Sequence, residues 1–364
     1  MEVEDDGTVL RCRASVGPRA SLRSQAVQTS DPAGLGGSRG GHDASQTLRR
    51  SEGETMSDIR IGFIGLGGMG AGMASRLAES GFALAVYNRT AEKAEPLAAL
   101  GARVAESPAD AAADADVVML SLADETVVAT MVLGDDGVFS VLRPGGTVVD
   151  LSTVSPAFAH DLSDRARRLG FKALDACVYG APMHARSGEL RVMVGGDEGD
   201  FLEIRPILSV IGKDVTYLGA SGMGATMKIV LNMLMGVQMP ALAEAIVFGE
   251  RAGLSRESIL KMIAGSGYAS PVMSFRCAVI GRRSFDDAAF KLGLMSKDMN
   301  LALAESHRLG VPMPVAESAQ AALAAAAAMG LADLDVAAIV AAQERLSGID
   351  TYAWPGAVRD EGER

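Results

Sequence analysis

The chain has 364 residues, of which 48% are hydrophobic and 22% are charged, a composition typical of soluble globular proteins with room for two domains. Its formal net charge of −11 argues against a nucleic-acid-binding protein, which needs a basic face. The three cysteines lack metal-ligand spacing, so we expect no metal site, no disulfide framework and a cytoplasmic location.

Residues 1–55 contain no Phe, Trp, Tyr or Ile and are rich in Ser, Gly, Arg and Ala. Such a segment cannot bury enough apolar surface to offset the entropy lost on ordering, so the sequence predicts a disordered extension. Its acidic start lacks an apolar run and is not typical of a secretory signal. The favoured interpretation is a start codon assigned too far upstream, with Met56 as the working start. A partner-binding tail is the alternative.

A short apolar strand beginning at Ile59 leads directly into a glycine-rich turn and a helix. The turn matches G-x-G-x-x-G in the position that gives this pattern its meaning, after a strand and before a helix. The glycines allow a tight turn and close approach of a pyrophosphate, and the helix N-terminus offers N–H groups to the anion. A tight turn without a ligand is the alternative. The predicted cofactor contacts here are Gly65, Leu66, Gly67, Gly68, Met69 and Gly70.

The second predicted strand, 82–87, ends in Asn88, Arg89 and Thr90, which we also predict to contact the cofactor. An NAD-selective fold places Asp or Glu here, against the ribose 2′-hydroxyl. The Arg89 guanidinium can instead pair with a 2′-phosphate. The sequence therefore favours NADP(H), with NAD(H) also possible. The alternative for Arg89 is a solvated residue at the start of a helix.

Strands and helices continue to alternate up to about residue 219. Helices are expected at 91–100, 107–113, 156–169 and 197–211, and strands at 103–104, 116–120 and 147–150. This alternation predicts an α/β, Rossmann-type, doubly wound parallel sheet. Ligands of such sheets bind at the carboxyl ends of the strands, so Leu122, Ala123, Ser152 and Thr153 are placed to line the crevice.

Beyond Gly219 the pattern is helical throughout. A long apolar-periodic run at 226–249 is interrupted by Gln238, Pro240 and Glu244, which favours a buried helix over a membrane span. Further helices are expected at 255–264, 290–309, 316–329 and 336–347. The expected organisation is an extension at 1–55, a dinucleotide-binding domain at 56–219, an all-helical substrate and dimerisation domain at 220–350, and a tail at 351–364.

Lys228 and Asn232 are four residues apart near the start of the long helix, so their side chains share one face. A lysine in this apolar setting is partly desolvated or faces a cleft, and its pKa can shift far enough for proton transfer near neutrality. The alternative is an inert lysine that extends to solvent from a core helix.

Four segments in order make the chain resemble the β-hydroxyacid dehydrogenases, the family of 3-hydroxyisobutyrate dehydrogenase and tartronate semialdehyde reductase. They are FIGLGGMGAGMASRL at 63–77, DLST at 150–153, GASGMGATMKIVLN at 219–232 and FKLGLMSKDMNLAL at 290–303. The resemblance implies hydride transfer between a nicotinamide cofactor and a small 3-hydroxyacid or semialdehyde. It assigns proton transfer to Lys228, with Asn232 orienting it, and implies that Lys297 reaches the cofactor. It also implies a homodimer or homotetramer.

One loop departs from the family pattern, in which small residues hold the substrate carboxylate. Here Tyr179 replaces a serine, while Ala181 and His184 replace glycines. The resemblance assigns substrate binding to Ser152, Tyr179, Gly180, Ala181 and Lys228. A phenol at Tyr179 reshapes the pocket, unless the side chain is a loop residue turned to solvent.

Two other functions stay open. Imine reductases are similar in fold but commonly carry Asp or Tyr at the position of Lys228; the lysine argues against them, and Tyr179 keeps them in consideration. A non-catalytic scaffold that binds nucleotide would be expected to lack the lysine.

Overall fold

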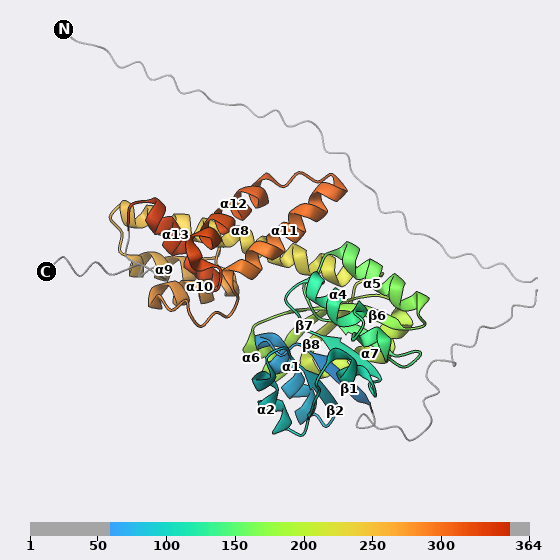
Figure 1. Ribbon diagram of the computed structural model, residues 1–364. Helices are drawn as coiled ribbons and strands as arrows, with labels where there is room; N and C mark the ends of the chain where they lie inside the picture. Colours follow the sequence, from blue (N-terminus) through green and yellow to red (C-terminus); the bar gives the residue numbers. More distant parts are fainter. Residues whose placement is uncertain (1–58, 350–364) are drawn as a thin grey trace, which may run out of the picture. The chain divides into compact units, whose positions relative to one another are not determined.

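The computed structural model describes residues 59–349, so the predictions for the 1–55 extension and the 351–364 tail lie outside the described residues. The first part of this range forms one eight-stranded sheet of order β3-β2-β1-β4-β5-β6-β7-β8 (Figure 1). The strands are β1 (Arg60–Ile64), β2 (Ala83–Tyr87), β3 (Arg103–Val104), β4 (Val117–Leu120), β5 (Thr147–Asp150), β6 (Lys172–Tyr179), β7 (Leu190–Gly195) and β8 (Gly212–Tyr217).

Successive side chains of a strand point to opposite faces of the sheet, so a strand that is apolar throughout must be covered on both faces. Helices provide that cover here. The helices of this part are α1 (Gly68–Glu79), α2 (Glu95–Ala98), α3 (Pro108–Ala112), α4 (Glu125–Leu133), α5 (Pro156–Arg168), α6 (Pro182–Ser187) and α7 (Glu198–Ile211). In β1, Phe63 belongs to one core, with α1 and α7, and Ile64 belongs to the other, with α3, α4 and α5. The predicted doubly wound sheet is confirmed.

The sheet differs from the expectation at one strand pair, since β7 runs antiparallel to β6 while the other pairs are parallel. The connection between β6 and β7 contains only the short helix α6, and a parallel pair needs a longer crossover. The chain therefore turns back beside β6 and resumes parallel pairing with β8 after α7.

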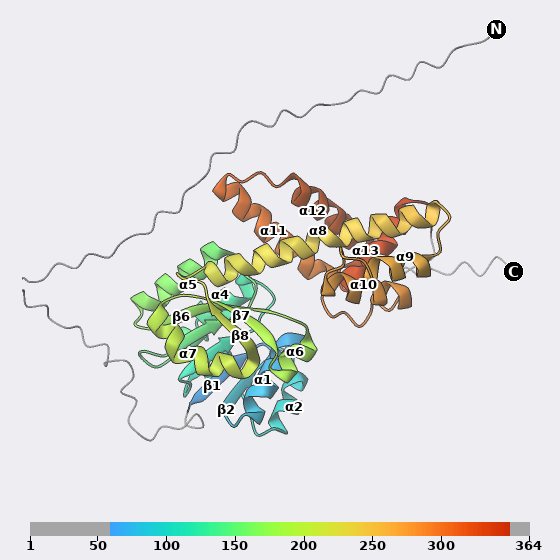
Figure 2. The ribbon, with the colours of Figure 1, turned by 180° about the vertical axis from the view of Figure 1, so that it is seen from behind.

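The second part is helical and has its own apolar core. Its helices are α8 (Met223–Arg251), α9 (Arg256–Ala264), α10 (Pro271–Arg282), α11 (Leu292–Leu309), α12 (Pro314–Ala326) and α13 (Ile339–Leu346). α11, α12 and α13 pack against the long α8 (Figure 2). α10 was not among the expected helices, although Ser270 caps it by accepting the Met273 N–H and Pro271 opens its first turn.

α8 continues through Pro240 as one helix of 29 residues. Among the described residues it is the one helix long and apolar enough to cross a membrane by length and composition, and 44% of its most apolar window is buried inside the protein. Its buried face includes Ile229, Met239 and Ile246, which belong to the protein core.

Candidate active site

The glycine turn between β1 and α1 has the geometry of a phosphate cradle. Gly65 has a φ of 97°, which favours glycine, and a Cβ on Gly70 would lie 2.0 Å from the Gly65 carbonyl oxygen. A Cβ on Gly67 would meet nothing within 4 Å, so its backbone faces open space. The first turn of α1 carries no acidic side chain. These residues therefore fit a dinucleotide pyrophosphate at the helix N-terminus.

The end of β2 is tied to this turn by Asn88. Its Oδ1 accepts the Leu66 N–H at 2.9 Å and its Nδ2 donates to the Thr90 carbonyl at 2.9 Å. The Asn88 side chain thus shapes the turn, while Arg89 and Thr90 are exposed. The structure places Arg89 beyond the carboxyl end of β2, where the adenosine ribose of a dinucleotide lies in this fold.

The predicted residues after β4 and β5 meet through Lys297 of α11. Its Nζ donates to the Ala123 carbonyl at 3.1 Å and to the Thr153 carbonyl at 2.7 Å. The same two loops are joined by the Leu122 N–H, which donates to Ser152 Oγ at 2.9 Å. Lys297 therefore reaches the loops in which the predicted cofactor residues lie.

Lys228 lies on α8 facing the carboxyl end of β6. Its Nζ donates to the Val178 carbonyl at 2.8 Å and lies 5.8 Å from the centre of the Tyr179 ring. Burial lowers the pKa of Lys228, and the nearby Asp298 carboxylate opposes that shift. The half-buried Lys228 amine therefore loses its proton more readily than a solvated lysine does.

Asn232 does not make the contact expected of it, since its amide is directed to α11. Its Nδ2 donates to Asp298 Oδ2 at 2.6 Å, and Lys297 Nζ lies 3.0 Å from Asp298 Oδ1. Asp298 is 1% exposed, so this carboxylate is a buried centre that links Asn232 to Lys297. Asp298 is not among the residues predicted from the sequence, although an acidic residue on the core-facing side of an apolar helix is a signal for it.

The loop after β6 is held by a contact that the sequence interpretation also missed. The Ala181 N–H donates to His184 Nδ1 at 3.0 Å, so this predicted substrate donor already has a partner. Gly180 has a φ of 151°, and a Cβ there would lie 2.7 Å from Leu190. His184 therefore stabilises the start of α6, which accounts for its presence in place of a small residue. Tyr179 is half-buried and turned toward Lys228, not fully to solvent.

Two family models together span nearly all of the described range. The NAD-binding domain of 6-phosphogluconate dehydrogenase matches residues 60–219, and the NAD-binding domain of NADP-dependent 3-hydroxyisobutyrate dehydrogenase matches residues 222–343. 2-(Hydroxymethyl)glutarate dehydrogenase of Eubacterium barkeri is 35% identical over 80% of this chain and 97% of its own length. The chain belongs to the β-hydroxyacid dehydrogenase family.

Solved structures agree with this assignment. 3-Hydroxyisobutyrate dehydrogenase of Mycobacterium tuberculosis, solved with L-serine, is 32% identical, with a TM-score of 0.70 over 78% of this chain and 99% of its own. An imine reductase of Myxococcus stipitatus, with NAD+, is 22% identical, with a TM-score of 0.53 over 77% of this chain and 97% of its own, and shares the fold. The chain is therefore an NAD(P)-binding oxidoreductase of the hydroxyacid dehydrogenase type that acts on CH–OH groups.

Proposed function

We propose that this enzyme interconverts a short semialdehyde or oxo acid and the corresponding hydroxyacid, with NADP(H) preferred and Lys228 as the general acid and base. The observation that carries the proposal is the half-buried Lys228 amine, 2.8 Å from the Val178 carbonyl at the end of β6. The hydroxyacid named for the Eubacterium relative supports the substrate class.

A bound nicotinamide supplies hydride acceptor and donor chemistry. In reduction, the Lys228 ammonium donates a proton to the substrate carbonyl oxygen, and in oxidation the neutral amine accepts the hydroxyl proton. The Val178 carbonyl orients Nζ, and Asp298 opposes the lowering of the Lys228 pKa and so favours the ammonium that acts as the acid. Ser152 is buried, its Oγ accepts the Leu122 N–H, and its side chain also hydrogen-bonds Asp150, so binding the far end of the substrate would exchange that bond.

Imine reduction is the second candidate, and Tyr179 is the observation that favours it. Its aromatic ring beside Lys228 offers an apolar and cation-stabilising wall that a simple oxo acid does not need. Since the Ala181 N–H is engaged by His184, we propose that a substrate carboxylate depends on Ser152 and the remaining backbone donors of this loop.

A substrate panel tests the proposed function. NADPH oxidation would be followed with short semialdehydes, 2- and 3-oxo acids and cyclic imines, using protein begun at Met56 and the full chain. We expect turnover of at least one oxo acid or semialdehyde. Turnover of imines alone would replace the proposal with the second candidate.

We also infer that Arg89 selects NADP(H), because its guanidinium is exposed at the end of β2 and Asn88 offers no carboxylate to a ribose hydroxyl. Arg89→Ala is expected to lower kcat/KM for NADPH by about tenfold, the loss of one charge-assisted phosphate contact, with little change for NADH. The exposed Arg168→Ala on α5 is the matched control. Equal kcat/KM for NADH and NADPH in the unaltered enzyme would contradict the assignment.

We propose that α8 pairs with a second copy of this chain, because an apolar stripe runs along its exposed side. The larger side chains of this α8 stripe expose between 37% and 76% of their surface, and they are Met223, Met227, Val230, Leu234 and Phe248. These residues expose roughly 500 Å² per copy, so two copies bury about 1,000 Å², the lower limit for a specific interface.

The order of side-chain sizes along the α8 stripe supports a two-fold pairing. Residues spaced three or four apart share this face of α8. In chain order they are Met227, Val230, Leu234, half-buried Val237, and exposed Ala241 and Ala245. An antiparallel pair places Val230 opposite the small Ala241. The same register brings Ala245 beside Met227 and Met223 opposite Phe248, so large residues meet small ones only in the middle of the stripe.

Leu234→Glu is expected to convert the pair to monomers at micromolar concentration, as measured by light scattering after gel filtration. Met262→Glu, on an α9 residue that is 72% exposed and outside the α8 stripe, is the control and should leave the mass unchanged. A monomeric unaltered protein, or one that binds neutral lipid vesicles through this face, would contradict the pairing. The cytoplasmic location stays a prediction of the sequence.

A further inference from the structure

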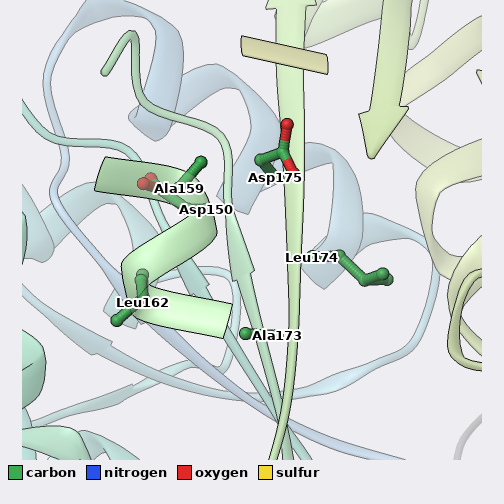
Figure 3. Close-up of a pocket in the computed structure, with 6 residues that line it drawn as sticks. All are labelled: Asp150, Ala159, Leu162, Ala173, Leu174 and Asp175. Atoms are coloured by element: carbon green, nitrogen blue, oxygen red, sulfur yellow. The ribbon is translucent and has the colours of Figure 1, made fainter. Parts of the chain in front are cut away.

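Two buried carboxylates stand side by side beneath the candidate site and have no role in the proposed proton transfer. Asp150 ends β5 and Asp175 is its register partner in β6. They are 2% and 3% exposed. Figure 3 shows both side chains together with Ala159 and Leu162 of α5. Neighbouring positions of parallel strands point to the same face, so the two carboxyl groups belong to one environment.

Asp175 holds the N-terminus of α8, the helix that carries Lys228. Its Oδ1 accepts the Gly222 N–H at 2.8 Å and its Oδ2 accepts the Ala225 N–H at 2.9 Å. The helix packs closely here, because a Cβ on Gly224 would lie 2.6 Å from the Asp175 carbonyl oxygen. Two N–H donors and the positive end of the helix dipole favour the ionised form of Asp175.

Asp150 has a poorer set of partners. Its Oδ1 accepts the Ser152 N–H at 2.9 Å, whereas its Oδ2 is buried without a hydrogen-bond partner among the described residues. A cavity of about 10 Å³ lies beside the two carboxylates, close to the space that one water molecule needs. A buried, unpaired anionic oxygen is costly, while a protonated one can donate to a water or to its neighbour.

We propose that Asp150 and Asp175 form one carboxyl pair that holds a single proton, on Asp150, and that this pair positions both the Ser152 loop and the N-terminus of α8. Asp150 fixes the loop through the Ser152 N–H, and Asp175 fixes the helix through Gly222 and Ala225. Both are positioning residues, since each acts on the site through another group.

The charges around the pair agree with this distribution of the proton. Burial raises the pKa of Asp150 to about 6; the hydrogen bonds from Ser152 and the charge of Lys297 on α11 oppose this shift, and the Asp175 carboxylate acts in the same direction as burial. Burial also raises the pKa of Asp175, and the hydrogen bonds from the N–H groups of Gly222 and Ala225 lower it.

Other groups beside the pair are uncharged. Cys177 on β6 stays a neutral thiol, because burial raises its pKa well above the usual range. The groups contributed by α5 are the apolar Ala159 and Leu162.

The direct test is a titration of the protein labelled with ¹³C at the aspartate carboxyl carbons, followed by NMR. One resonance, assigned by its loss in Asp150→Asn, is expected to titrate near pH 6 in the unaltered protein. In Asp175→Asn the same resonance should titrate at lower pH, because the neighbouring negative charge is gone. Asp150 titrating near 4, the ordinary value, would overturn the proposal, as would a midpoint that Asp175→Asn leaves in place.

A thermal measurement repeats the test without labels and still applies if Asp175→Asn fails to fold. The folded protein binds the Asp150 proton more tightly than the unfolded chain, so its stability falls as pH rises through the window between 4 and 6. The melting temperature of the unaltered protein minus that of Asp150→Asn should fall by roughly 4 °C between pH 4.5 and 7. Asp161→Asn, which removes a half-exposed carboxylate on α5, is the control. A flat difference for Asp150→Asn would overturn the proposal.

The effect on catalysis rests on the proposed function and is read separately. Ionisation of Asp150 adds a second negative charge beneath the Ser152 loop, so KM for an anionic substrate should rise roughly threefold between pH 5.5 and 7.5, with little change in kcat. Asp150→Asn should abolish that rise. A KM rise that persists in Asp150→Asn would overturn the positioning role, whereas an enzyme without oxo acid turnover would contradict the proposed function and leave the NMR result standing.

Discussion

Lys228→Met is expected to lower kcat for the proposed reduction by about 10²–10⁴-fold, the usual contribution of a general acid. Methionine keeps the length and apolar stem of lysine but carries no proton. The affinity for NADPH, measured by fluorescence titration, should be nearly unchanged, because Lys228 contacts the Val178 carbonyl and the Tyr179 ring and not the glycine turn.

The stability of the same variant separates a catalytic lysine from a structural one. Burial disfavours the Lys228 ammonium, so removal of the charge should leave the melting temperature unchanged or raise it. Lys261→Met on α9, an exposed lysine, is the matched control and should keep full activity. A parallel loss of cofactor affinity, melting temperature and turnover in Lys228→Met would show that the lysine is structural.

Asp298→Asn is expected to move the basic limb of the pH profile for reduction to lower pH. Asp298 raises the pKa of Lys228 against the effect of burial, so its neutralisation lets the pKa of Lys228 fall. The ammonium that donates the proton is then lost at a lower pH, and kcat/KM should fall more above neutrality than below it.

The control variant for Asp298→Asn is Asp333→Asn, which neutralises an exposed carboxylate that pairs with Lys291 at the surface. It should leave the pH profile in place. If Asp298→Asn lowers kcat/KM equally at every pH, the carboxylate acts by holding Asn232 and Lys297 and not by tuning Lys228.

The parts of the fold that the sequence predicts are those with local causes. The glycine turn depends on neighbouring residues, and its G-x-G-x-x-G pattern is confirmed by the positive φ of Gly65 and the contact of Gly70 with Gly65. Ser107 and Pro108 likewise mark the start of α3, where Ser107 accepts the Asp110 N–H. Patterns of this kind are complete within a few residues, so a single sequence contains them.

The parts that sequence interpretation missed depend on residues far apart in the chain. Asp298 contacts Asn232, 66 positions away, and Asp175 caps α8 through Gly222, 47 positions away. Neither pairing has a local pattern. The antiparallel β7 follows from the short α6 connection, whose helix depends on His184 bonding the Ala181 N–H. The polar network beneath Lys228 is therefore a product of the fold and could not be read from composition or spacing.

The most direct test of the account follows deuterium from NADPH labelled at C4 into the product of a short oxo acid or semialdehyde, by mass spectrometry. The account predicts one deuterium on the former carbonyl carbon of the hydroxyacid, formed by the unaltered enzyme and nearly absent with Lys228→Met. Label transfer only to cyclic imines, or equal transfer by Lys228→Met, would contradict a lysine-dependent hydroxyacid dehydrogenase.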